Sequence, residues 1–128
     1  MGEVRRMAVC GPVSPQVSWD RYVVLARWSS WAPQISGVDA DAERLQPGLT
    51  GRVRTSVGLK VPFVITDVDA AAMTWSWIVG AGPVRHTLHH GIAPRGSGTR
   101  ATLAIEGAAP LVTAYAPLAW WALRRLVH

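Results

Sequence analysis

The sequence has one cysteine, one phenylalanine and one lysine, and these shortages narrow what the chain can be. Because Cys10 is alone, an internal disulfide and a cysteine-based zinc site are both excluded. Seven tryptophans stand beside the single phenylalanine, so indole rings supply most of the aromatic surface available to a core or a pocket. We therefore expect an interior rich in tryptophan, with no disulfide, no metal site and no cofactor.

The chain is also poor in acidic residues, and its excess positive charge is scattered. Twelve arginines and Lys60 outweigh eight acidic residues, which gives a net charge of +5. The only close basic pairs are Arg5 with Arg6, Arg52 with Arg54, and Arg124 with Arg125. Nucleic-acid-binding proteins concentrate such charge in a run or stripe interleaved with aromatics. We therefore expect a solvated basic surface and no nucleic-acid partner.

Long hydrophobic runs are missing as well. The N-terminus lacks the continuous apolar stretch of a signal peptide. The apolar run from Leu111 to Leu123 is too short for a membrane span, contains Pro117, and ends at a pair of arginines. The 128 residues are 49% hydrophobic, enough for one core, so we expect a single folded domain over 1–128. The expected setting is the cytoplasm, without membrane insertion.

The C-terminal stretch from Ala109 to His128 has helical periodicity and an unusually wide apolar face. At about 100° per residue, that face covers roughly 200° of the helix. It is expected to comprise Leu111, Val112, Tyr115, Leu118, Ala119, Ala122, Leu123 and Leu126, with Ala116, Trp120 and Val127 at its border. Such a helix needs a partner that curves around it, and this arrangement often leaves a cavity between the two layers.

The middle of the chain offers strands for that partner. After a short strand over Val4–Cys10 and a helical segment over Val17–Ala26, a helical turn from Trp28 ends before Pro33. From Gln34 the apolar period becomes two, and Gly, Pro and Asp turns separate the repeats. The predicted strands are Gln34–Ala40, Gly51–Val57, Val61–Val68, Met73–Val79, Arg85–Ala93 and Thr99–Glu106. Short connections favour an antiparallel meander, so the predicted class is α+β.

Alternation assigns the inward face of each strand. Trp75 and Trp77 point inward on one strand, and His86, Leu88 and His90 on the next. The other inward positions are Val61, Phe63, Ile65, Val79, Ile92, Ala101, Leu103 and Ile105. His86 and His90 lie about 13 Å apart along their strand, so they cannot chelate one metal ion by themselves.

Two sequence stretches resemble a known family. These are the W-x-x-W-x-P stretch of Trp28, Trp31 and Pro33, and an H-x-I-x-P stretch followed by G-T-R. The second comprises His90, Ile92, Pro94, Gly98, Thr99 and Arg100. With the terminal helix, the chain from about Val17 to Val127 resembles the SRPBCC superfamily, in particular its START-related, polyketide cyclase/dehydrase-like branch.

The resemblance implies a helix-grip fold, in which a curved antiparallel sheet wraps around a long C-terminal helix. Two short helices near the N-terminus complete this fold. It also implies a hydrophobic cavity for a lipid-like, polyketide-like or aromatic molecule, which some members cyclise or dehydrate. One departure stands out: the family's long first strand is expected here to be short and broken by Gly11-Pro12. The sheet would then be incomplete, or a second chain would cover its edge.

The candidate site combines inward aromatic and polar groups. For catalysis, His90 or His86 would serve as general base or acid, because imidazole exchanges a proton near neutral pH. Tyr115 would donate a hydrogen bond to an enolate-like oxygen, and Arg54, if it faces inward, would stabilise negative charge. The predicted ligand-binding residues are Phe63, Trp75, Trp77, Leu88, Leu103, Ala119 and Leu123.

Two alternatives remain open from the sequence. The same rings would also be expected if they only filled a core, without a ligand. A second function, a non-enzymatic interaction module, would use the open sheet edge and Trp121 to bind a protein partner or to form a homodimer.

Overall fold

The computed structural model describes residues 2–128 and shows seven strands, three α-helices and two short 3₁₀ turns. In chain order these are β1 (Gly2–Gly11), α1 (Pro15–Val23), a 3₁₀ turn (Leu25–Arg27), α2 (Trp28–Trp31), β2 (Ile35–Ala40), β3 (Thr50–Thr55), β4 (Lys60–Asp69), β5 (Thr74–Val79), a 3₁₀ turn (Gly82–Val84), β6 (His86–Arg95), β7 (Gly98–Ala108) and α3 (Ala109–Val127). Each predicted strand and helix is present, and the α+β class is confirmed.

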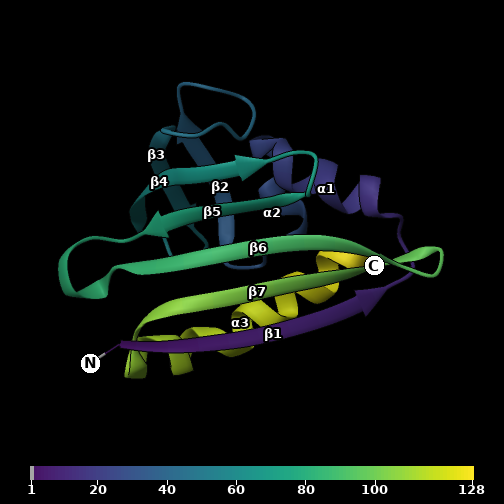
Figure 1. The fold of residues 1–128 in the computed structure, drawn as a ribbon. Coiled ribbons are helices and arrows are strands. Elements are labelled where there is room, and N and C mark those ends of the chain that lie inside the picture. The colour runs from purple at the N-terminus through teal and green to yellow at the C-terminus, as the bar shows by residue number, and fades with distance from the viewer. Residues whose placement is uncertain (1) are drawn as a thin grey trace.

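The strands form one antiparallel sheet in the order β1-β7-β6-β5-β4-β3-β2. From β2 to β7 each strand pairs with its sequence neighbours, because the connections are short enough for a meander. The chain's first strand then closes the far side by pairing with β7. Figure 1 shows the result: the sheet curves, and α3 lies behind β7 and β1 while α1 and α2 cover another part of the same face.

The expectation of a short, broken first strand is wrong. β1 runs from Gly2 to Gly11 and pairs with β7 over its whole length, from Gly2 opposite Ala108 to Gly11 opposite Thr99. Pro12 ends the strand but does not interrupt it, because it lies beyond the last paired residue. The sheet is therefore complete, and the reason for expecting a second chain to cover a missing strand disappears.

The N-terminal helices fill one end of the sheet with aromatic rings. Ser14 caps α1 by accepting a hydrogen bond from the Val17 N–H at 3.2 Å, and Pro15 occupies the first helical turn. Trp28 is 1% exposed, stacks on Trp75 with ring centroids 5.5 Å apart, and donates its indole N–H to the Tyr22 carbonyl oxygen at 2.8 Å. The hydrogen bond of the buried Trp28 indole and its stacking on Trp75 orient the N-terminal helices on the sheet.

Helix α3 buries a stripe of mostly small or branched residues: Val112, Ala116, Ala119, Ala122, Leu123, Leu126 and Val127. The buried stripe is narrower than predicted, because Leu118 is 39% exposed and Trp120 is 47% exposed. Trp121, which is not part of the predicted apolar face, is also exposed. No helix among residues 2–128 is long and apolar enough to cross a membrane.

The C-terminal end of α3 is held against the end of β1. The Val13 N–H donates to the Val127 carbonyl oxygen at 3.2 Å, and a Cβ added at Gly11 would overlap that same carbonyl group. Glycine at this position therefore allows the end of β1 to contact the end of α3. This contact holds the edge of the sheet against the helix.

We predict that Gly11→Ala lowers the free energy of unfolding by about 1–3 kcal/mol, because the added methyl group separates β1 from α3. Gly2→Ala is the matched control: it lies on the same strand, and its Cβ would meet nothing nearer than the Gly107 carbonyl oxygen at 3.7 Å. That variant should stay within about 0.5 kcal/mol of the wild type. Urea unfolding measures both, and equal effects would contradict the contact.

Candidate functional site

A cavity of about 280 Å³ lies at the end of the sheet where β5 ends and β6 begins. Its wall is formed by β3 to β6, by the start of β2 and by the first half of α3. The lining residues are Gln34, Ile35, Val53, Thr55, Val61, Trp77, Val79, Gly80, Val84, His86, Leu88 and Tyr115. Most of the wall is aliphatic or aromatic, and within residues 2–128 the lining includes no Asp, Glu, Lys or Arg. The cavity thus has the character of a small-molecule site.

The polar groups of the wall come from Gln34, His86 and Tyr115. The Gln34 side-chain N–H donates to the Tyr115 hydroxyl oxygen at 3.0 Å, and the rings of Tyr115 and His86 lie 6.3 Å apart. Two buried polar atoms here have no partner within residues 2–128: Gln34 Oε1 and His86 Nε2. Burial raises the pKa of the Tyr115 hydroxyl, so it stays neutral and keeps its proton.

The structure places only part of the predicted site around this cavity. Trp77, Leu88, His86 and Tyr115 line it. The remaining predicted ligand-binding residues are buried in the core and do not line it: Phe63, Trp75, Leu103, Ala119 and Leu123. Alternation identified the inward face of each strand correctly. The helices cover most of that face, and the cavity lies where it is left uncovered, at the end of the sheet where β5 ends and β6 begins.

His90 belongs to the filled core and not to the cavity. Trp77 Nε1 donates to His90 Nε2 at 3.1 Å, and the ring stacks on Trp75 with centroids 4.3 Å apart. Because Nε2 accepts, the proton of the neutral ring is on Nδ1, which lies 3.2 Å from the Tyr22 hydroxyl oxygen. Burial, with a smaller contribution from His89, lowers the pKa of His90 from 6.5 to about 3. A base with both nitrogens occupied and this pKa does not fit the predicted catalytic role.

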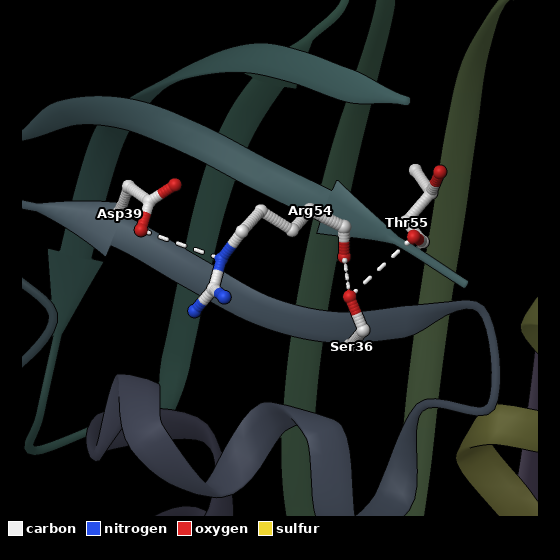
Figure 2. Close-up of polar contacts among 4 residues, drawn as sticks. All are labelled: Ser36, Asp39, Arg54 and Thr55. Carbon is white, nitrogen blue, oxygen red and sulfur yellow. Dashed lines mark hydrogen bonds and ion pairs between the residues drawn. The ribbon is translucent and has the colours of Figure 1, made fainter. Parts of the chain in front are cut away.

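Arg54 lies on the outer face of the sheet. It alternates with the buried Val53 on β3, so its side chain extends across β2, where its Nε is 3.3 Å from an Asp39 carboxylate oxygen (Figure 2). A register shift after Ile35 leaves Ser36 unpaired, and its hydroxyl donates to the carbonyl oxygens of Arg54 and Thr55. The condition that Arg54 faces inward is not met, so it cannot stabilise charge in the cavity.

Sequence reasoning did not single out Gln34, which supplies a buried acceptor of the cavity wall. Val61 and Val79 were on the predicted inward face, and Val53 follows from the same alternation, so pattern could have placed them. Gln34 gave no such signal, because a polar residue at the first position of a predicted strand is usually exposed to solvent. The structure also shows no group of three or more His, Cys, Asp or Glu residues within 2–128 that could hold a metal ion.

The buried state of His90 predicts an acid-dependent loss of stability. Below pH 6.5 the unfolded chain protonates this imidazole, whereas the folded chain resists protonation until about pH 3. The free energy of unfolding should therefore fall as the pH drops through this window, by up to about 1.4 kcal/mol per pH unit from this group. Urea unfolding between pH 7 and pH 4 measures the slope.

In His90→Gln that part of the slope should disappear, although the variant is less stable at pH 7 by about 1–3 kcal/mol because the partners of the imidazole lose hydrogen bonds. His128→Gln, at an exposed position, is the control and should keep the wild-type slope. An unchanged slope in His90→Gln would show that the imidazole is not held neutral.

Comparison with known proteins identifies the fold. No family model matches the sequence, and no curated protein matches it. Among solved structures, the chain is similar to the crystal structure of Ara h 8.0201, with a TM-score of 0.79 and 12% sequence identity over 98% of this chain and 95% of that one. At this identity the similarity establishes the fold alone. The chain has the helix-grip fold, with a curved seven-stranded antiparallel sheet around a long C-terminal helix.

Proposed function

We propose that the protein binds a small hydrophobic or aromatic molecule in the cavity between β3–β6 and α3. The observation that supports this proposal is the cavity itself: about 280 Å³ is left unfilled beside a core that is packed with aromatic and aliphatic side chains. Empty volume costs folding free energy, because the surrounding atoms lose dispersion contacts. Tryptophan side chains, which this protein uses elsewhere in its core, are large enough to fill part of this space too. A binding role explains why the space stays open.

The surroundings of the cavity support access from solvent. Two connections contribute lining residues at their ends: the β3–β4 turn, between Thr55 and Val61, and the β5–β6 turn, between Gly80 and His86. Each turn also carries exposed apolar side chains, Val57 and Leu59 on the first and Val84 on the second. Apolar residues at the rim of an apolar cavity are suited to guide a hydrophobic ligand inward.

Within this proposal, Trp77 and Leu88 provide apolar contacts, and Trp77 offers a ring face to a flat ligand. If the protein also catalyses a reaction on its ligand, the candidate groups are His86 and Tyr115. The imidazole of His86 would be the base, and the neutral hydroxyl of Tyr115 would donate to a developing enolate oxygen. That chemistry corresponds to the aldol cyclisation and dehydration implied by the polyketide-cyclase resemblance. His90 and Arg54 have no part in it, because neither lines the cavity.

A second candidate function, an interaction module, is favoured by one surface. The outer side of α3 exposes Leu118, Trp120 and Trp121, large side chains that solvent-facing helices rarely display together. Because β1 is complete, no strand is missing that a partner would have to supply, and the edge strands of the sheet are β1 and β2. We regard ligand binding as the better supported function, since it accounts for the unfilled interior.

The proposal predicts that filling the cavity abolishes binding. In Val79→Trp an indole would occupy space now lined by Val79, so the affinity for naphthalene should fall at least about tenfold. The adjacent Ile78 has its side chain on the opposite face of β5 and does not line the cavity. Ile78→Trp is therefore the matched control and should bind like the wild type.

Titration followed by backbone amide resonances measures the affinity and reports where the probe binds. The result that would defeat the proposal is a wild-type protein that binds no apolar probe, or two tryptophan variants that bind equally well.

A further inference from the structure

The wall of the cavity contains more hydrogen-bonding capacity than the protein uses. Gln34 and Tyr115 are joined by one hydrogen bond, in which the amide N–H donates and the hydroxyl oxygen accepts at 3.0 Å. This arrangement leaves Gln34 Oε1 as a buried acceptor without a donor. It also leaves the Tyr115 O–H proton without an acceptor among residues 2–128. One free acceptor and one free donor therefore belong to two side chains in contact.

His86 adds a third polar group to the same wall. Its Nε2 is buried without a partner, and its ring packs over Gly107, where a Cβ would lie 2.9 Å from the ring carbon Cδ2. The absence of a side chain at position 107 thus makes room for the imidazole beside Tyr115. A buried polar atom without a partner destabilises the folded protein, so a ligand group that pairs it recovers this free energy on binding.

The free groups have the pattern that a hydroxyl group complements. A hydroxyl is donor and acceptor at one atom, so it can donate to Gln34 Oε1 while its oxygen accepts from the Tyr115 O–H. A carboxylate offers acceptors only and would oppose Gln34 Oε1. It would also enter a wall with no arginine or lysine among the described residues, where an unpaired charge is strongly disfavoured.

The volume limits the size of the apolar body. A cavity of about 150 Å³ lined by apolar side chains binds benzene. The cavity here, about 280 Å³, is nearly twice as large and accommodates two fused or linked rings. Trp77 and Leu88 line the space that such rings would occupy.

We propose that the cavity selects neutral two-ring molecules that carry a hydroxyl group, with Gln34 and Tyr115 as the residues that recognise the hydroxyl. This inference rests on the proposed function and adds the chemical class of the ligand and its polar contacts.

Three probes that share one ring system test the inference: naphthalene, 2-naphthol and 2-naphthoate. A phenolic hydroxyl with a pKa near 10 is neutral at pH 7, whereas the carboxylate is charged. The wild type should bind 2-naphthol about tenfold more tightly than naphthalene, because two hydrogen bonds form, and should bind 2-naphthoate most weakly. Backbone amide titrations at pH 7 give the three dissociation constants.

Gln34→Leu should reduce the preference for 2-naphthol to about threefold or less, while naphthalene still binds. Retained naphthalene binding shows that the variant is folded with its cavity intact. Gln46→Leu, which changes an exposed glutamine away from the cavity, is the matched control and should keep the full preference.

The outcomes separate the two proposals. Equal binding of naphthalene and 2-naphthol by the wild type, tightest binding of 2-naphthoate, or an undiminished preference in Gln34→Leu overturns the hydroxyl inference and leaves the binding function standing. Binding of none of the three probes overturns the proposed function itself.

Discussion

The imidazole of His90 accepts a hydrogen bond from Trp77 on β5 and donates one toward Tyr22 on α1, so three elements meet at one buried ring. Tyr22 is fully buried, and burial raises the pKa of its hydroxyl, so neither partner is charged at neutral pH. A neutral network in which every member has a partner can be buried at little cost and fixes one arrangement of the helices on the sheet. Because Trp77 also lines the cavity, the same network positions the aromatic wall of the proposed binding site.

The interior is therefore divided into two parts with different physical character. On one side of Trp77, buried rings of α1, α2 and β5 pack against one another, several of them edge to face. On the other side, aliphatic residues and three partly satisfied polar side chains surround empty volume. Under the proposed function, the first part contributes stability and the second contributes selectivity for the ligand, so substitutions in the two parts should affect different properties.

Most of the fold could be predicted from the sequence because period-two alternation is a local property of each strand. Trp75, Trp77 and Leu103 point inward as expected, and the strand bounds differ by few residues.

The position of the cavity could not be predicted, because it depends on where α3 and the N-terminal helices cover the sheet. Trp75 and Trp77 are equivalent in pattern, yet only Trp77 reaches the open end. The position of Gln34 in the cavity wall could not be predicted for a similar reason, since it depends on a contact with Tyr115, which is distant in the sequence. The first strand was mispredicted because Gly11 and Pro12 suggested an interruption, whereas Gly11 serves the close approach of α3.

The pairing of β1 with β7 brings together two strands that are far apart in the sequence, which affects the order in which the sheet can form. β7 and α3, which contact β1, are the last two elements in chain order, so during synthesis the first strand emerges long before these neighbours exist. The meander from β2 to β7 can form progressively from local hairpins, but closing the sheet requires a contact across nearly the whole polypeptide. We expect β1 docking to be the late step of folding, with its unpaired edge exposed to other chains until α3 is in place.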